Sequence, residues 1–229
     1  MSAAPGIAVP SNAFEERAAL LLAVRQAGVR DISVMRAIES VPREAFAPFR
    51  FRDLANRNMS LPLGCGQTMS RPADIGRRIE ALRIGRGHRV LEVGTGSGYG
   101  AAILARLARE VVTIERFETL AIEAARKLAA LGVSNALAMH GDGLEPARTL
   151  GEFDRIIVEA ALHAPPAALL KILSPGGALV YARSEGGGPD ARPRQRLIKV
   201  DRIEGGALRE SDLGPHSLCA ATSGAAKSL

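Results

Sequence analysis

Two segments near the start of the chain carry apolar residues at helical spacing. Apolar side chains recur every three or four positions over residues 14–27 and stop at Gly28, which predicts a helix. Ile32–Ser40 repeats the pattern over a shorter length, and loop-rich sequence comes after it as far as Pro62. We therefore expect a helical N-terminal subdomain over about residues 13–60, too short to fold alone and packed on the rest of the chain.

Beyond residue 61 short apolar runs of strand length alternate with amphipathic stretches of helix length. This alternation predicts a parallel sheet with helices on its faces and right-handed crossovers. We predict an α/β fold with a doubly wound, mostly parallel, Rossmann-like sheet of seven strands, and the pattern leaves the order of the last strands open. The predicted strands are residues 88–93, 110–114, 135–139, 153–158, 178–182 and 197–203 with a seventh near Leu218, and the predicted helices are 73–82, one that ends at Leu107, 118–131 and 165–173.

The length of 229 residues suits a single domain, residues 1–229, whose α/β core spans about residues 61–219. Small and polar residues without periodicity predict a loose start over residues 1–12 and a flexible tail over residues 220–229. A Gly-, Pro- and Arg-rich stretch predicts a loop at residues 184–195.

Composition narrows the class of protein. Hydrophobic residues make up 47% of the chain but aromatic residues only 3%, so aliphatic side chains must fill the core. No apolar run approaches the roughly 20 residues that span a bilayer, and the N-terminus lacks the pattern of a secretory signal. Cys65 and Cys219 fit neither a disulfide framework nor a metal site, and the histidines are dispersed, so we expect a cytoplasmic protein without a bound metal.

The net charge of +6 raises the question of nucleic-acid binding. The basic residues are 26 arginines against 4 lysines, and they are scattered apart from a group at residues 183–196: Arg183, Arg192, Arg194 and Arg196. Stacking aromatic residues, which single-strand binders use, do not accompany them. We therefore expect a solvated basic surface on a monomer rather than a nucleic-acid interface.

A glycine turn lies where the first predicted strand meets a helix, in the segment Val-Leu-Glu-Val-Gly-Thr-Gly-Ser-Gly-Tyr at residues 90–99. Glycine lets the backbone turn sharply there and approach a ligand closely. The spacing is G-x-G-x-G rather than the G-x-G-x-x-G of dinucleotide enzymes, and Glu92 could face the cationic α-amino group of a bound amino-acid moiety. The turn residues expected at the cofactor are Gly94, Thr95, Gly96 and Gly98.

Acidic residues also end the next two predicted strands. Glu115 ends the second strand, at a suitable distance to bind ribose hydroxyls. Asp142, beside Gly141, ends the third strand, where it could accept a hydrogen bond from an adenine amino group. Ligands of open α/β sheets bind at these strand ends. Together with Glu92, these carboxylates favour S-adenosyl-L-methionine over NAD and indicate a methyltransferase.

The stretch Gly-Gln-Thr-Met-Ser-Arg-Pro at residues 66–72 resembles the signature G-Q-T-[IM]-S-x-P of the protein-L-isoaspartate O-methyltransferase family. In that family the signature also precedes the glycine turn by about twenty residues. The resemblance covers about residues 14–182 in the same order. It continues through Val41-Pro42-Arg43 with Phe46, the glycine turn, Ile114-Glu115-Arg116, Gly141-Asp142-Gly143, residues 153–158 and residues 173–179.

The resemblance implies methylation of the free carboxylate of L-isoaspartyl residues in damaged proteins, with isoaspartyl peptides and proteins as partners. The ester then collapses through a succinimide, which returns part of the product to normal aspartate. A carboxylate has a reference pKa of about 4, so it needs no general base, and positioning should supply most of the acceleration. The family's active-site serine falls on Ser70, and its cofactor-covering loop on Gln67 and Thr68. From the residues alone Ser70 is an N-cap of the helix at residues 73–82, and both roles are compatible.

The second half of the chain departs from the family pattern. Glu159 comes after the fourth strand where the family usually has Thr or Gly, and an unpaired carboxylate there would repel an anionic substrate. We expect Arg71 or Arg183 to compensate by pairing with Glu159 or with the substrate carboxylate. His163 is the histidine nearest the expected site. Further departures lie at residues 162–163, 181–183 and 213–216.

Two alternative functions stay open at this point. A divergent paralogue could keep the cofactor fold and methylate another substrate, with Glu159 as general base toward a hydroxyl or an amine. A third class is a protein that binds S-adenosyl-L-methionine without isoaspartyl activity.

Overall fold

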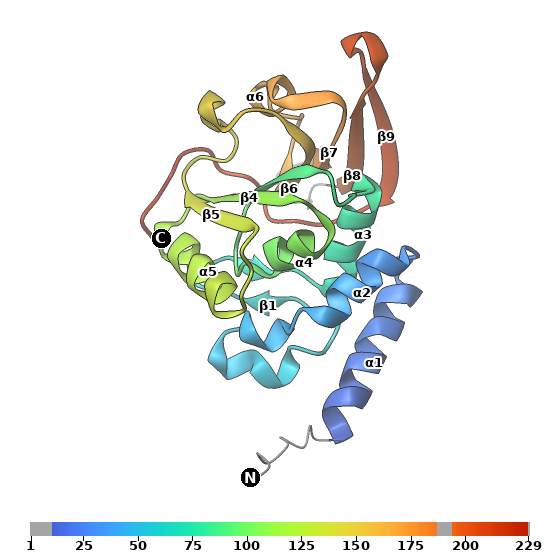
Figure 1. Ribbon diagram of the computed structural model, residues 1–229, viewed down its shortest axis with the longest axis vertical. Coiled ribbons are helices and arrows are strands. Elements are labelled where there is room, and N and C mark those ends of the chain that lie inside the picture. Colours follow the sequence, from blue (N-terminus) through green and yellow to red (C-terminus); the bar gives the residue numbers. More distant parts are fainter. Residues whose placement is uncertain (1–10, 187–193, 229) are drawn as a thin grey trace, which may run out of the picture.

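The computed structural model describes residues 11–186 and 194–228, with side chains from residue 15 onward. Its main sheet consists of β3 (Arg89–Val93), β4 (Glu110–Glu115), β5 (Ala136–His140), β6 (Phe153–Leu162), β7 (Leu173–Glu185), β8 (Arg194–Arg202) and β9 (Leu208–Pro215). The strand order is β5-β4-β3-β6-β7-β8-β9, with β3 to β7 parallel and the last two antiparallel. The predicted α/β fold with a mostly parallel seven-stranded sheet is confirmed (Figure 1).

Alternate residues of the central strands face two separate apolar cores. In β3, Val90 packs in one core and Leu91 in the other, and Ile157 and Ile156 of β6 divide in the same way. The first core lies under the helices α3 (Pro72–Leu82), α4 (Tyr99–Leu107) and α5 (Glu118–Ala130), and the second includes the short helix α6 (Ala167–Lys171). Burial on both faces explains why these strands are almost continuously apolar.

The N-terminal helices α1 (Ser11–Gln26) and α2 (Ile32–Ser40) pack against α3, as the helical spacing predicted (Figure 1). Asp31 caps α2 by accepting hydrogen bonds from the backbone N–H groups of Ser33 at 2.7 Å and Val34 at 3.4 Å. Two 3-10 turns, η1 (Arg43–Ala45) and η2 (Phe49–Leu54), lie in the stretch expected to be loop. A small antiparallel sheet of β1 (Leu61–Pro62) and β2 (Thr68–Met69) then leads into α3.

The structure corrects the prediction of the last strand. The segment near Leu218 is not a strand of the sheet; β9 pairs antiparallel with β8 and forms the edge at Leu208–Pro215. Most of β9 is solvent-exposed and polar, so the strand lacks the apolar run that marks the others. The predicted loop at residues 184–195 is shorter, because its first two residues lie in β7 and its last two in β8.

Two further boundaries differ from the sequence-based prediction. The helix expected at residues 165–173 is only α6, since Leu173 already pairs with Phe153 as the start of β7. The predicted loose start falls mostly on residues 1–10, which lie outside the described residues, as do residues 187–193 with Arg192. Within the described ranges no helix is both long enough and apolar enough to cross a membrane.

The C-terminal segment, which we expected to be a flexible tail, is hydrogen-bonded in the structure to the connection between β4 and α5. The backbone N–H of Ala226 donates to the carbonyl of Arg116 at 2.7 Å, and the N–H of Glu118 donates to the carbonyl of Ala226 at 3.0 Å. The chain after β9 therefore returns across the molecule and ends beside α5 (Figure 1). The division into domain parts remains a prediction.

Candidate active site

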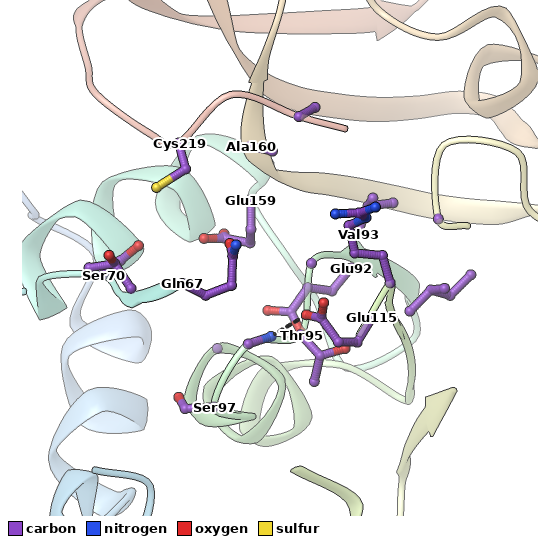
Figure 2. Close-up of a pocket in the computed structure, with 18 of the residues that line it drawn as sticks. Gln67, Ser70, Glu92, Val93, Thr95, Ser97, Glu115, Glu159, Ala160 and Cys219 are labelled. Atoms are coloured by element: carbon purple, nitrogen blue, oxygen red, sulfur yellow. Dashed lines mark hydrogen bonds between the residues drawn. The ribbon is translucent and has the colours of Figure 1, made fainter. Parts of the chain in front are cut away.

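One pocket gathers most of the predicted site residues. It lies where β3 passes into α4 and has a volume of about 990 Å³, its open mouth included. Nine of the eleven predicted site residues line it: Gln67, Thr68, Ser70, Glu92, Gly94, Thr95, Gly96, Glu115 and Asp142. The two that do not are Gly98 and Gly141. Figure 2 labels five of the nine: Gln67, Ser70, Glu92, Thr95 and Glu115.

The glycine turn adopts the left-handed backbone that its sequence predicted. Gly94, Gly96 and Gly98 have φ angles of 97°, 52° and 87°, a region that side chains rarely tolerate. A Cβ on Gly94 would lie 3.2 Å from the Cβ of Glu159 at the pocket, whereas one on Gly98 would lie 3.1 Å from the Cβ of Ala124 on α5. Gly98 thus serves the packing of α4 against α5 rather than the pocket lining.

Glu92 is a buried carboxyl at the base of the turn. The hydroxyl of Thr113 donates to its Oε2 at 2.6 Å, and the hydroxyl of Thr95 lies 2.5 Å from that of Thr113. Burial, reinforced by the nearby charge of Glu159, raises the pKa of Glu92 well above its ordinary value. A cationic group placed beside it would reverse this effect, so the carboxyl suits an ammonium ligand.

Gly100, in the first turn of α4, is a site residue that sequence reasoning missed. A Cβ there would lie only 2.3 Å from Oε1 of Glu92, so the helix can pass the carboxyl only because this residue is glycine. The glycine comes directly after the segment at residues 90–99 and could have been included in the turn on that ground.

Glu115 and Asp142 lie at the carboxyl ends of β4 and β5, as predicted. Glu115 accepts hydrogen bonds from the backbone N–H of Gly96 at 2.8 Å and that of Phe117 at 3.1 Å, which holds its carboxylate against the glycine turn (Figure 2). Asp142 accepts from the N–H of Leu144 at 2.9 Å. Gly141 contributes only its backbone, donating to the carbonyl of Glu115 at 3.0 Å.

The segment with the GQTMS motif passes through β2 and brings Ser70 to the pocket. The hydroxyl of Ser70 has no hydrogen-bond partner within residues 11–186 and 194–228. The alternative role of Ser70 as an N-cap is wrong: Arg71 is the N-cap residue of α3, and Asn58 accepts from the backbone N–H of Ala73 at 3.0 Å. The Ser70 hydroxyl is therefore available to a ligand.

Arg43, from the Val-Pro-Arg motif, fixes the backbone of Ser70 from behind. Its buried guanidinium donates to the carbonyl of Ser70 at 3.1 Å. The other acceptors are carbonyls of the loop before β1: those of Ala55 at 2.8 Å, Arg57 at 3.2 Å and Met59 at 2.9 Å. Burial lowers the pKa of Arg43 to about 10, so the group remains cationic at neutral pH. The N-terminal subdomain thus positions one wall of the pocket.

The partner of Glu159 is Arg78, not Arg71 or Arg183. Nε of Arg78 donates to Oε1 of Glu159 at 2.9 Å, and Nη2 donates to Oε2 at 2.5 Å. Arg78 projects from α3 on the same face as Ile75 and Leu82, and its side chain is fully buried. In the sequence, an arginine among the apolar positions of a helix indicates that it has a buried acidic partner. The sequence does not say which acidic residue that partner is.

The two arginines that we expected to compensate Glu159 are engaged elsewhere. Arg71 pairs with Asp74 at 2.8 Å in the first turn of α3, and Arg183 pairs with Glu210 of β9 at 2.5 Å. His163 is exposed and does not line the pocket; its Nδ1 lies 3.3 Å from the carbonyl of Ser184. The prediction that one of these arginines pairs with Glu159 was wrong, because each has another acidic partner, Asp74 on α3 or Glu210 on β9.

The C-terminal segment supplies a wall of the pocket that sequence reasoning missed. Its lining residues are Cys219, Ala220, Ala221 and Thr222. Ala161 of β6 holds them by donating to the carbonyl of Cys219 at 2.8 Å and accepting from the N–H of Ala221 at 2.9 Å. Further along, the N–H of Gly224 donates to Oδ2 of Asp142 at 2.6 Å. The segment has no apolar periodicity, so nothing in the sequence marked it.

Within the described ranges no group of three or more His, Cys, Asp or Glu side chains is placed to hold a metal ion. The features of the pocket are thus carboxylates at successive strand ends, a glycine turn and a free serine hydroxyl.

Comparisons with known proteins agree with this arrangement. A family model described as protein-L-isoaspartate(D-aspartate) O-methyltransferase (PCMT) matches residues 15–220. Protein-L-isoaspartate O-methyltransferase 2 of Rhodopseudomonas palustris (strain HaA2) is 44% identical over 195 residues, which cover 85% of this chain and 88% of that protein. The protein-L-isoaspartate O-methyltransferase of Rhodospirillum centenum (strain ATCC 51521 / SW) is 45% identical over 197 residues, covering 86% of each chain.

Solved structures show the same fold. A protein-L-isoaspartate O-methyltransferase aligns with a TM-score of 0.75 at 23% identity, over 90% of this chain and 66% of that chain. A Plasmodium falciparum structure described as a beta-aspartate methyltransferase (PCMT), in complex with S-adenosyl-L-homocysteine, aligns with a TM-score of 0.74 at 21% identity over 88% of this chain and 96% of that chain. On the sequence matches, this chain belongs to the protein-L-isoaspartate(D-aspartate) O-methyltransferase family, whose cofactor is S-adenosyl-L-methionine.

Proposed function

We propose that this protein methylates the free carboxylate of L-isoaspartyl residues in damaged proteins, with S-adenosyl-L-methionine as methyl donor. The observation that carries the proposal is the free hydroxyl of Ser70, whose backbone carbonyl accepts from Arg43, in a pocket that also contains the glycine turn and its carboxylates. A repair enzyme of this class returns part of the product to normal aspartate through a succinimide.

The residues of the pocket fit the cofactor. Glu92 is a buried carboxyl with a raised pKa, and the α-amino group of the methionine moiety would stabilise its ionised form from inside the pocket. We assign Glu115 to the ribose hydroxyls and Asp142 to the adenine amino group, because both end strands beside the turn. The backbone of Gly94, Thr95 and Gly96 would follow the ligand, and Gln67 and Thr68 would cover it. The expectation that Gly98 lines the cofactor site gives way to a packing role against α5.

When bound, S-adenosyl-L-methionine supplies a methyl group made electrophilic by a sulfonium charge. An ionised carboxylate can accept that group without losing a proton, so the chain needs no general base. Ser70 would donate a hydrogen bond that orients the acceptor carboxylate, while Gln67 and the C-terminal wall restrict water. Orientation and exclusion of water are the contributions we assign to the protein.

The geometry weighs against the paralogue with Glu159 as general base. Both carboxylate oxygens of Glu159 accept hydrogen bonds from a buried arginine, so both are already engaged where a general base would have to receive a proton. We therefore retain the repair function as the single candidate.

The test is methyl transfer to a synthetic peptide that contains one isoaspartyl residue, with the same peptide containing aspartate as control. We expect turnover of the isoaspartyl peptide only. Ser70→Ala should lower kcat by roughly tenfold or more while the dissociation constant of S-adenosyl-L-homocysteine stays unchanged. Equal turnover of both peptides, or none of either, would contradict the proposal.

Oligomeric state and compartment rest on sequence arguments alone. We propose a monomer, and we propose that it works in the reducing cytoplasm because its two cysteines are unpaired. Sedimentation of the purified protein tests the first point, and fractionation of cells tests the second.

A further inference from the structure

Arg78 is fully buried and contacts Glu159, which lines the pocket. We call the part of the pocket near Ser70 and Glu159 the acceptor side, because Ser70 is assigned to the methyl acceptor. Arg78 lies on the apolar face of α3 and has three polar partners, two of them the carboxylate oxygens of Glu159. The third is His216, whose Nε2 lies 2.8 Å from Nη1 of Arg78. A guanidinium held on three sides is fixed in one orientation.

His216 acts as the acceptor in this contact. Burial is the main cause that lowers the pKa of His216 to about 4, and the positive charge of Arg78 is the second. The ring is therefore neutral at physiological pH. Arginine can only donate, which makes Nε2 of the neutral ring the acceptor. The backbone of His216 is itself tied to β8, because its N–H donates to the carbonyl of Gln195 at 3.0 Å. The segment after β9 thus locks Arg78 in place.

Glu159 presents its carboxylate to the pocket on the side where the acceptor would enter. Figure 2 shows it on the same side as Ser70, Gln67 and Cys219, away from Glu115. Its side chain keeps 14% exposure, and it lines the cavity. Glu92 and Glu115 line the same cavity at the part that we assign to the cofactor, which leaves Glu159 as the carboxylate on the side of Ser70.

The charge at this wall decides which acceptors can approach. An unpaired carboxylate at Glu159 would repel the carboxylate of the methyl acceptor a few ångströms away. In a partly desolvated pocket this repulsion is large enough to weaken binding of the acceptor severalfold. A bidentate arginine cancels that charge while leaving the oxygens in place. No other Lys, Arg or His among the described residues makes a hydrogen bond or ion pair to Glu159.

We propose that Arg78 is a positioning residue that determines acceptor specificity: it holds Glu159 as a neutral ion pair at the acceptor wall, so that the pocket admits an anionic carboxylate. This inference rests on the proposed function. It explains how a glutamate at position 159, where the family usually has Thr or Gly, is compatible with an anionic substrate. His216 keeps the guanidinium aligned from the far side.

The net charge that each variant leaves at Arg78 and Glu159 distinguishes this role from a purely structural one, because it predicts the direction in which the KM changes. Glu159→Gln removes the negative charge and leaves the arginine, so the KM for an isoaspartyl peptide should fall about tenfold. Arg78→Met exposes the negative charge, so the KM should rise about tenfold. The double variant Arg78→Met with Glu159→Gln has a neutral wall again and should return to within about threefold of the wild type. A packing role would instead impair all three variants.

The experiment measures kcat and KM for the isoaspartyl peptide at saturating S-adenosyl-L-methionine in these three variants. Arg77→Met is the matched control, since Arg77 lies on the same helix, one residue earlier, and does not line the pocket. Its KM should match that of the wild type. Calorimetry with S-adenosyl-L-homocysteine should show a smaller change in the dissociation constant than in the KM, because Glu159 faces the acceptor and acts on the cofactor site only through its charge on Glu92.

The KM values of the variants decide between the proposal and its alternatives. A KM that falls in Glu159→Gln, and is restored in the double variant relative to Arg78→Met, supports the proposal. A raised KM in Glu159→Gln in an otherwise active, folded protein overturns it and leaves the repair function intact. If Arg78→Met does not fold, the Glu159→Gln variant alone still decides. A wild-type protein without isoaspartyl activity overturns both proposals.

Discussion

At the scale of single residues, Glu115 and Asp142 give the most direct test of the cofactor site. We expect Glu115→Ala and Asp142→Ala each to weaken binding of S-adenosyl-L-homocysteine by roughly 1–3 kcal/mol, since each removes hydrogen bonds to a charged group. Titration calorimetry measures the effect. Glu110→Ala is a suitable control because Glu110 begins β4, at the end remote from the pocket, where it pairs with Arg89. Unchanged affinity in both site variants would contradict the assignment.

Glu92 gives a prediction about pH. Burial raises its pKa in the free protein, and a bound ammonium group beside it should lower that pKa again. Binding therefore releases a proton, and affinity for S-adenosyl-L-homocysteine should increase as pH rises from the ordinary pKa of a glutamate, about 4.3, toward the raised pKa of Glu92. Calorimetry in two buffers of different ionisation enthalpy detects the released proton.

The control for this effect is Glu92→Gln. Its side chain has a similar shape and does not titrate, so its affinity should be weaker and nearly independent of pH over that range. Proton uptake on binding by the wild type would contradict an ammonium partner for Glu92.

The three carboxylates could be predicted because the end of each strand is recognisable from the local sequence alone. The sequence did not predict Arg78 with Glu159 and His216, since those contacts join residues 81 and 138 positions apart. Periodicity places Arg78 on an apolar face and predicts that it needs partners. Which partners it finds depends on the order of strands, and that order was left open.

At the scale of elements, the C-terminal segment is the part of the pocket most open to direct test. It comes after the last strand of the sheet, so a chain ending after Leu218 should keep all seven strands. Loss of residues 219–229 removes the wall at Cys219–Thr222 and the hydrogen bond from Gly224 to Asp142. We expect the dissociation constant of S-adenosyl-L-homocysteine to rise about tenfold, which corresponds to about 1.4 kcal/mol.

Circular dichroism of the truncated protein controls for its fold. Unchanged affinity in a folded, truncated protein would show that the segment covers the pocket without contributing to cofactor binding.

Strands buried on both faces were predictable, and the edge strand β9 was not. The strands at residues 89–93 and 153–162 are apolar because both of their faces are covered. In contrast, β9 is held by backbone pairing with β8 while most of its side chains face solvent. Backbone hydrogen bonds leave no signature in side-chain pattern, which is also why the segment around Ala226 was expected to be loose.

At the scale of the whole molecule, the acceptor side of the pocket is assembled from distant parts of the chain. Arg43 ties the N-terminal subdomain to Ser70, and Arg78 ties α3 to both β6 and the segment after β9. Each tie is a buried arginine with several acceptors, which is costly to break because a charge would be left unpaired. Stability and site geometry therefore depend on the same contacts, and a change in the protonation of one of them should affect global unfolding.

His216 makes that dependence measurable. Its pKa is lowered to about 4 in the folded protein, against about 6.5 in an unfolded chain. Between these values the unfolded chain binds a proton that the folded protein excludes, so the stability from the neutral ring is present above pH about 6.5 and is lost as pH falls toward about 4. In His216→Gln the amide oxygen can still accept from Arg78, but nothing titrates. The free energy of unfolding in urea should therefore favour the wild type by about 2 kcal/mol more at pH about 7 than at pH about 5, since the contributions of other groups cancel between the two proteins. A stability difference that stays constant over this range would mean that His216 is not held neutral against Arg78.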